Sequence, residues 1–209
     1  MFGRLKAKAR ERSEKLKKVA FQLDMDFIPI DEYGFVSMLK DFRLFKYGHS
    51  KKITNMMYKR DVWNQLDVRL FDYRFVIQAG NTPVHHRQSV IFIQSKLLNL
   101  PEFLLKPETF FHWVAAKLGM EDIDFEAFPE FSNQYHLTGR DEELIRHQFN
   151  KDVLQFFTIE KDWRLEGVNY YLIFYKRRHL FSPEEIKSFY QKGMQLYQML
   201  REQSKEEPK

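Results

Sequence analysis

The run from Trp63 to Gln78 carries large apolar side chains at consecutive positions, so both of its faces need cover. Aromatic and β-branched residues dominate the run, which is typical of a β-strand. A strand that is apolar on both faces normally lies inside a sheet whose two sides are both packed. The run therefore predicts a central strand.

Further strand-like runs surround this one. Ile53–Lys59 precedes it, and Val84–Leu97 follows after the loop Ala79-Gly80-Asn81-Thr82-Pro83. A five-residue loop that contains glycine between two such runs predicts a β-hairpin. A second hairpin is predicted around Gly167, between Trp163–Glu166 and Val168–Tyr175.

Helix signals begin further along the chain. Pro107 suits the first turn of a helix whose apolar face covers Phe110–Leu118. Thr138 with Asp141 resembles a capping box that opens a helix at Glu142–Phe149. Asn150–Glu160 fits either a helix capped by Asn150 or a strand, and its apolar spacing favours the helix.

The end of the chain holds the clearest helix signal. Ser182-Pro183-Glu184-Glu185 supplies a cap, a proline and a third-position glutamate before a long amphipathic stripe. The predicted fold class is α+β: a mostly antiparallel sheet with packed helices, a long C-terminal helix and an N-terminal basic amphipathic helix. We expect a basic helical arm at residues 1–24, a single α+β domain at 25–203 and a polar tail at 204–209.

Positive charge is concentrated in the arm. The chain has 34 Lys and Arg against 29 Asp and Glu, and residues 1–20 hold eight of the basic groups against Glu11 and Glu14. The arm is therefore +6 (8 − 2), and the other 189 residues are −1 (26 − 27). The eight cations are the candidate contacts to an anionic surface or partner: Arg4, Lys6, Lys8, Arg10, Arg12, Lys15, Lys17 and Lys18.

Missing residues and motifs exclude several classes of protein and site. The absence of cysteine excludes disulfides, thiolate zinc sites and cysteine nucleophiles. No apolar run approaches the roughly 18 residues of a membrane span, and residues 1–20 do not resemble a signal peptide. Phosphate-binding glycine loops and the serine-hydrolase elbow are missing. We expect no cofactor, metal site or catalytic residue, and a cytoplasmic location with membrane association through the arm.

Three polar groupings still merit attention. Asp72 and Arg74 share one face of the central strand and are candidates for a polar anchor in an apolar cleft, or for a structural ion pair. Asp122 and Asp124 would project from the same side of an extended segment, although their surroundings fail the calcium-loop template. His85 and His86 are adjacent, so a regular strand would point them to opposite faces.

A dispersed series of short motifs resembles a bacterial protein family of unknown function whose members often carry N-terminal hydrophobic helices. The series covers about residues 35–200 and comprises Asn55, Phe71-Asp72-Tyr73-Arg74-Phe75, Gln88-Ser89-Val90, Leu100-Pro101-Glu102-Phe103, Pro107-Glu108, Asp122-Ile123-Asp124-Phe125, Phe131-Ser132, Tyr135, Leu137, Trp163, Glu166-Gly167 and Tyr175. Here a basic arm stands in place of those hydrophobic helices. The resemblance implies a bacterial domain that faces the cytoplasm at the membrane surface, and it brings no activity.

These observations favour a non-catalytic binding or scaffolding domain, peripheral to the inner membrane through its arm. The expected partner is an anionic membrane surface or a protein. One alternative is an acid/base or metal-assisted hydrolase that combines Asp122, Asp124 or Asp72 with a histidine such as His86. Another is nucleic-acid contact through the arm, which the near-neutral body disfavours.

Overall fold

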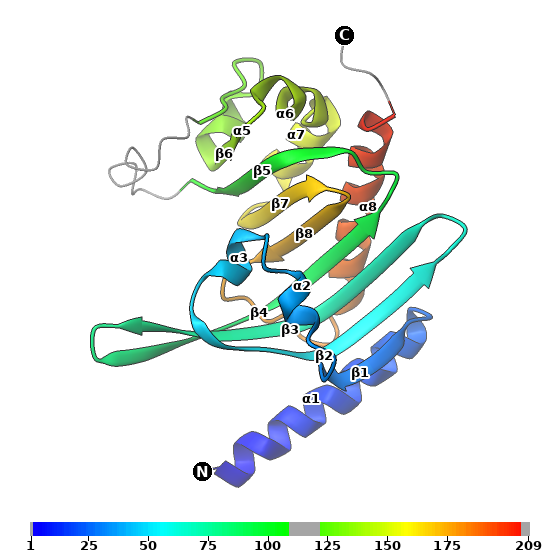
Figure 1. Cartoon of the computed structure of the whole chain (residues 1–209), viewed down its shortest axis with the longest axis vertical. Coiled ribbons are helices and arrows are strands. Elements are labelled where there is room, and N and C mark those ends of the chain that lie inside the picture. The colour runs from blue at the N-terminus through cyan, green and yellow to red at the C-terminus, as the bar shows by residue number, and fades with distance from the viewer. Residues whose placement is uncertain (1, 109–121, 206–209) are drawn as a thin grey trace. The chain divides into compact units, whose positions relative to one another are not determined.

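The computed structural model of the chain describes residues 2–108 and 122–205 (Figure 1). The helix predicted over Phe110–Leu118 falls in the segment 109–121 and therefore lies outside the described residues. Eight strands are hydrogen-bonded in the order β1-β2-β3-β4-β8-β7-β5-β6. Their bounds are β1 Asp26–Ile30, β2 His49–Asp61, β3 Leu66–Ala79, β4 Thr82–Ser95, β5 Leu100–Pro107, β6 Tyr135–Gly139, β7 Trp163–Asn169 and β8 Tyr171–Lys176.

Helices begin and end the described chain and connect its strands. The pairs β1–β2, β2–β3, β5–β6, β5–β7 and β7–β8 are all antiparallel, so the predicted α+β fold with a mostly antiparallel sheet is confirmed. The helices are α1 Phe2–Gln22, α2 Phe35–Met38, α3 Arg43–Lys46, α5 Pro129–Gln134, α6 Glu142–Gln148, α7 Lys151–Ile159 and α8 Ile186–Gln203. The predicted N-terminal and C-terminal helices are therefore both present.

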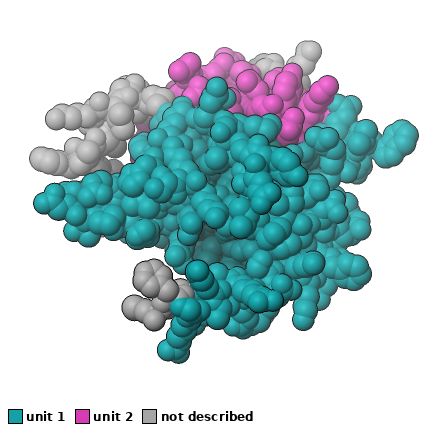
Figure 2. Space-filling model, turned by 60° about the horizontal axis from the view of Figure 1, so that its bottom comes forward, with its two compact units in different colours: residues 1–92, 178–193 teal, residues 93–177, 194–209 magenta. Residues whose placement is uncertain are grey.

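By its internal contacts the chain divides into two compact units, which Figure 2 colours separately. The first unit comprises Met1–Phe92 with Arg178–Gly193, and the second comprises Ile93–Arg177 with Met194–Lys209. The arm thus belongs to the same unit as β1, β2 and β3. The segment boundaries expected from the sequence stay a prediction.

Strand β3 lies at the centre of the first unit. Leu70, Phe71 and Tyr73 are at most 1% exposed, so consecutive residues are buried on both faces, as the central-strand prediction requires. The strand begins three residues later than predicted, because residues 62–65 form a turn. The Asp61 carboxylate accepts hydrogen bonds from the backbone and side-chain amides of Asn64, and this Asx-type turn leaves Trp63 95% exposed.

The hairpin between β3 and β4 is tighter than the sequence suggested. Only Gly80 and Asn81 separate the two strands, where a five-residue loop was expected. Gly80 has a φ of 58°, a left-handed conformation that glycine adopts without strain and that two-residue hairpin turns require. Thr82 and Pro83 therefore belong to β4 and not to the loop.

Aromatic rings fill the core of the first unit. Phe35 of α2 meets Phe71 of β3 and Phe92 of β4 edge to face, with ring centroids 5.7 and 5.3 Å apart. The ring centroid of Phe45 in α3 lies 4.5 Å from the ring centroid of Tyr73. The short helices α2 and α3 thus cover β3 by placing single phenylalanines on it.

Side-chain caps open α6 and α7 in the second unit. The Asp141 carboxylate accepts the amide of Leu144 at 3.1 Å at the start of α6, and Asn150 accepts the amide of Val153 at 3.1 Å at the start of α7. The helix at Asn150–Glu160 is confirmed. Thr138, expected to cap α6, lies in β6 instead, so Asp141 is the cap.

Strands β7 and β8 form the predicted hairpin with a different turn. Gly167 was expected in the turn, but β7 continues through it and the chain reverses at Asn169, whose φ is 52°. Gly167 instead packs against the ring of Phe103, and an added Cβ would come within 2.6 Å of the Phe103 Cζ atom. Close approach of β5 to β7, not turn geometry, is what requires glycine here.

Replacing Gly167 by alanine should therefore destabilise the protein. The new methyl group would overlap Phe103, which is 3% exposed and packed 5.1 Å from the Phe149 ring, so the core must shift. We expect a loss of about 1–3 kcal/mol in the free energy of unfolding, measured by urea denaturation. Gly3→Ala is the control, because no atom lies within 4 Å of its added Cβ. An equal effect of the two substitutions would contradict the packing argument.

Candidate functional site

An ion pair fixes α1 to the sheet of the first unit. The Arg12 guanidinium donates from Nε to Oδ2 of Asp72 and from Nη2 to Oδ1, both at 2.8 Å. The two side chains are 18% and 11% exposed. This two-point contact sets both the distance and the orientation of the helix relative to β3.

Two neighbouring strands complete the surroundings of Asp72. Asn55 of β2 donates from Nδ2 to Oδ2 at 2.9 Å, and Ser89 of β4 donates from Oγ to Oδ1 at 3.1 Å. The two carboxylate oxygens therefore accept four hydrogen bonds, as a buried charge requires. Ser89 Oγ also accepts the amide of Phe181 at 3.2 Å.

A local irregularity of β2 directs Asn55 toward Asp72. Asn55 has a φ of 53°, and the pairing of β2 with β3 shifts register between Thr54 and Met57. Such a bulge turns a side chain away from regular alternation. Asparagine is one of the few residues that tolerates the left-handed conformation, which explains why it can occupy this position.

Asp72 thus forms a structural ion pair, but with Arg12 and not with Arg74, and its role as a polar anchor in a cleft stays a prediction. Arg74 lies on the same strand and is exposed. The cation that reaches Asp72 comes from α1, sixty residues earlier in the chain. Sequence spacing along one strand could not reveal this, because the contact depends on where α1 packs.

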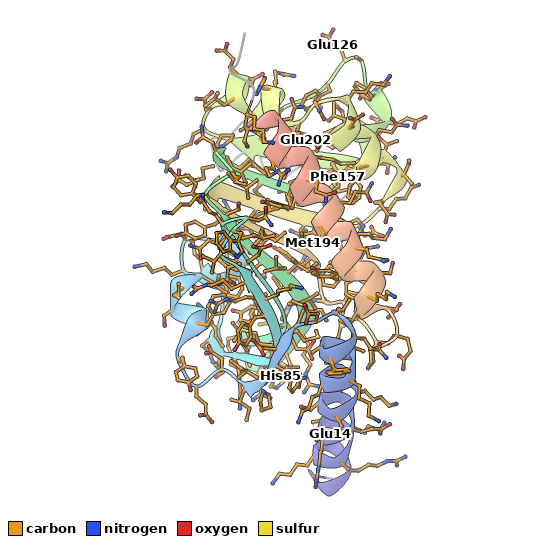
Figure 3. The ribbon with its side chains drawn as sticks, turned by 90° about the vertical axis from the view of Figure 1, so that its right-hand side faces the viewer. Glu14, His85, Glu126, Phe157, Met194 and Glu202 are labelled. Carbon is orange, nitrogen blue, oxygen red and sulfur yellow. The ribbon has the colours of Figure 1, made fainter. Side chains whose placement is uncertain are left out.

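The rest of α1 divides into a packed part and a free part. Leu16 and Ala20 are each 1% exposed and continue the contact that Arg12 begins. From Gly3 to Glu11, every side chain that the structure describes is exposed, and Figure 3 shows side chains fanning out from the end of α1 beyond Glu14. The exposed cations are Arg4, Lys6, Lys8, Arg10, Lys15, Lys17 and Lys18.

Two opposite charges on the exposed surface of α1 compensate each other. Lys15 Nζ lies 2.9 Å from Glu11 Oε1, one helical turn away. This hydrogen bond and charge attraction lower the pKa of Glu11 and raise the pKa of Lys15. Both groups are solvated, so the pair adds little to stability. Arg12, one of the eight predicted surface cations, is instead committed to Asp72.

The adjacent histidines point apart, as strand alternation predicts. His85 is exposed (Figure 3), whereas His86 is 3% exposed, stacks on Phe75 with centroids 4.8 Å apart and meets Arg178 Nε at 3.3 Å. Asp72 is held by Arg12, Asn55 and Ser89, so the predicted combination of Asp72 with His86 is not what the structure assembles.

A different histidine meets an acidic residue in the second unit. His136 Nδ1 lies 2.8 Å from Asp122 Oδ2 and 3.9 Å from Glu108 Oε2. Asp124 is exposed and does not join this group. Sequence reasoning missed Glu108 and His136 because their approach depends on the pairing of β5 with β6, which it did not foresee.

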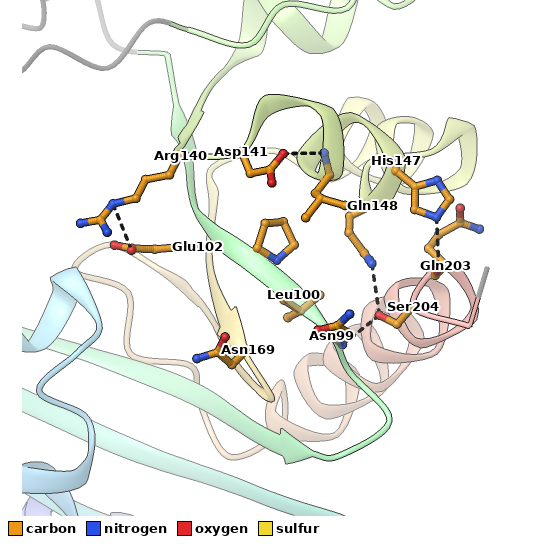
Figure 4. A pocket seen from close by; sticks show the side chains of 12 residues that line it. Asn99, Leu100, Glu102, Arg140, Asp141, His147, Gln148, Asn169, Gln203 and Ser204 are labelled. Atoms are coloured by element: carbon orange, nitrogen blue, oxygen red, sulfur yellow. Dashed lines mark hydrogen bonds and ion pairs between the residues drawn. The ribbon is translucent and has the colours of Figure 1, made fainter. Parts of the chain in front are cut away.

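The second unit also carries an open hollow of about 330 Å³ (Figure 4). Its polar side chains largely bond one another: Gln148 donates to Ser204 Oγ at 3.2 Å, and Arg140 Nε lies 3.5 Å from Glu102 Oε2. Glu108, Asp122 and His136 do not line it. The hollow itself is lined by Glu102, Asp141 and His147, which contact Arg140, the Leu144 amide and the Gln203 carbonyl.

Comparison with known proteins finds a solved structure with a similar fold. No protein-family model and no curated protein matches the chain, in agreement with the resemblance to a family of unknown function. Among solved structures, the mycobacterial trehalose monomycolate transport factor A, TtfA, is similar in fold with a TM-score of 0.61. It is 9% identical in sequence, and the match covers 93% of this chain and 94% of that one. Among the described residues, no helix is both long and apolar enough to cross a bilayer.

Arg12→Ala should destabilise the first unit. The substitution leaves the Asp72 carboxylate without its counter-ion in a largely buried site, and both groups retain some exposure, so we expect a loss of about 2–3 kcal/mol. Arg10→Ala, on the exposed surface of the same helix, should change the free energy of unfolding by less than about 0.5 kcal/mol. Denaturant unfolding of both variants measures the difference. If the two lose the same amount, the ion pair does not anchor α1.

Proposed function

We propose that this protein is a non-catalytic binding or scaffolding domain that docks on an anionic membrane surface through α1. The observation that supports the proposal is that some side chains of α1 pack on the sheet while its other basic side chains are exposed. Arg12, Leu16 and Ala20 hold α1 to the sheet, while seven cations remain exposed on it. A fixed helix with an exposed cationic surface is suited to contact with a large anionic surface.

The magnitude of this contact is modest. Seven exposed cations against Glu11 and Glu14 leave a net charge of +5 (7 − 2). At about 1 kcal/mol for each charge near an anionic bilayer, the attraction is about 5 kcal/mol, which corresponds to a dissociation constant near the millimolar range. Membrane contact of this strength is reversible. Tighter attachment would require a protein partner on the same membrane that binds this chain at the same time.

The structural neighbour supports this proposal only in outline. That protein is named a transport factor, a description compatible with a role alongside other proteins or at a membrane. The argument for this chain therefore rests on its own α1.

Vesicle co-sedimentation tests the proposal. The full chain should bind phosphatidylglycerol-rich vesicles at low salt, and the variant Lys6→Gln/Lys8→Gln/Arg10→Gln should bind about 100-fold more weakly, because it loses three charges worth about 1 kcal/mol each. Binding should also vanish at about 1 M salt, where the Debye length is about 3 Å. Substitution is preferable to deletion of the arm, since deletion would remove Arg12 and uncover Asp72.

The matched control removes three positive charges elsewhere. Lys96→Gln/Lys151→Gln/Lys161→Gln changes the net charge equally at exposed positions outside α1 and should bind like the unmodified protein. Equal losses in the two triple variants, or no vesicle binding at low salt, would contradict the proposal. Binding to single-stranded RNA that exceeds binding to vesicles and depends on the same three residues would instead assign the arm to nucleic acid.

A further inference from the structure

Three metal-ligating side chains converge at one end of the β5–β6 pair. Glu108 follows β5 directly, His136 is the second residue of β6, and Asp122 precedes the segment that hydrogen-bonds to β6. One donor atom from each residue lies within 4.8 Å of the others. The side chains of Glu108 and His136 are 16% and 15% exposed, so they are largely withdrawn from solvent.

Backbone contacts hold all three residues in place. Glu108 donates its amide to the Gln134 carbonyl at 2.7 Å, and β5 pairs with β6 in the register Lys106 with His136. Ile123 donates its amide to the Leu137 carbonyl at 2.8 Å, and the Leu137 amide donates to Asp122 Oδ1 at 2.9 Å. Asp122 is thus fixed by one carboxylate oxygen and presents the other to His136.

The loop that follows Asp122 is also tied down. Phe125 donates its amide to Ser132 Oγ at 2.9 Å, and Arg146 donates to the Asp124 carbonyl at 2.7 Å while its guanidinium lies over the Phe125 ring. A site whose ligands are positioned before the ion arrives loses little conformational entropy on binding.

The donor distances suit one ion. Donors that share a metal at about 2.1 Å lie roughly 3.0–3.4 Å apart in octahedral or tetrahedral geometry. The two measured separations from His136 Nδ1, 2.8 Å to Asp122 and 3.9 Å to Glu108, straddle this range. Small side-chain rotations would equalise them without moving the strands.

We propose that Glu108, Asp122 and His136 bind one divalent transition-metal ion, with Zn²⁺ as the best fit. The imidazole nitrogen is a borderline donor that favours Zn²⁺ over Mg²⁺ or Ca²⁺, which prefer oxygen alone, and Zn²⁺ also accepts carboxylate oxygens. Three protein ligands leave further coordination positions for water. This site is independent of the membrane contact of α1, and its first effect is to clamp the segment at Asp122 onto the β5–β6 pair.

A bound ion would replace a contact that the fold already makes. His136 Nδ1 and Asp122 Oδ2 lie 2.8 Å apart, a hydrogen-bonding distance. An ion between the imidazole and the carboxylate would be ligated by both atoms, with the imidazole proton on Nε2.

Calorimetric titration of the tag-free, chelator-treated full chain with ZnCl₂ tests the site. We expect one ion per chain and a metal-dependent rise in Tm. His136→Ala and Glu108→Gln should each weaken binding at least about tenfold and reduce the rise in Tm. Co²⁺ should give visible absorption bands with the unmodified protein and not with His136→Ala.

Two controls keep the outcome decisive. Asp124→Asn removes a neighbouring exposed carboxylate, and His147→Ala removes a histidine elsewhere in the same unit; both should bind Zn²⁺ like the unmodified protein. Glu108→Gln retains the contact between Asp122 and His136, so it tests the metal site even if His136→Ala fails to fold. No binding at one ion per chain, or binding that survives Glu108→Gln and His136→Ala unchanged, would overturn the proposal.

Discussion

The first unit depends on the compensation of one buried carboxylate. Asp72 is 9% exposed and lies between the buried residues Phe71 and Tyr73, and its charge is tolerable there because Arg12, Asn55 and Ser89 surround it. These partners come from α1, β2 and β4, so satisfying one side chain specifies the placement of three elements at once. The aromatic core around Phe71 stabilises the unit through apolar packing. The hydrogen bonds of Asp72 fix the position of α1 on the sheet.

This organisation explains which features could be predicted from the sequence. Consecutive apolar residues predicted β3, and a loop containing glycine predicted the β3–β4 hairpin. Apolar spacing favoured α7, and capping residues predicted α8, because all of these signals are local. The partner of Asp72 could not be predicted, since Arg12 reaches it only after α1 packs on the sheet. Gly167 was misassigned for a related reason: glycine permits both a turn and a close approach, and only the neighbouring Phe103 decides between them.

The same limit applies to the candidate sites. The eight basic residues of the arm could be found by counting, but their separation into one anchoring arginine and seven exposed cations needed the burial of Arg12. Asp122 was singled out by its acidic surroundings, whereas its real neighbours, His136 and Glu108, are brought to it by strand pairing. In both cases the residue type was visible in the sequence and the partner was a property of the fold.

The attachment of α1 has a mechanical consequence. A helix tied by a two-point contact cannot swivel freely as a flexible tether would, and the ten or so residues beyond Arg12 extend about 15 Å as a stiff rod. Any surface that engages the tip of this rod is held at a defined tilt relative to β3. Force applied at the tip would be transmitted through the contact between Arg12 and Asp72 into β3.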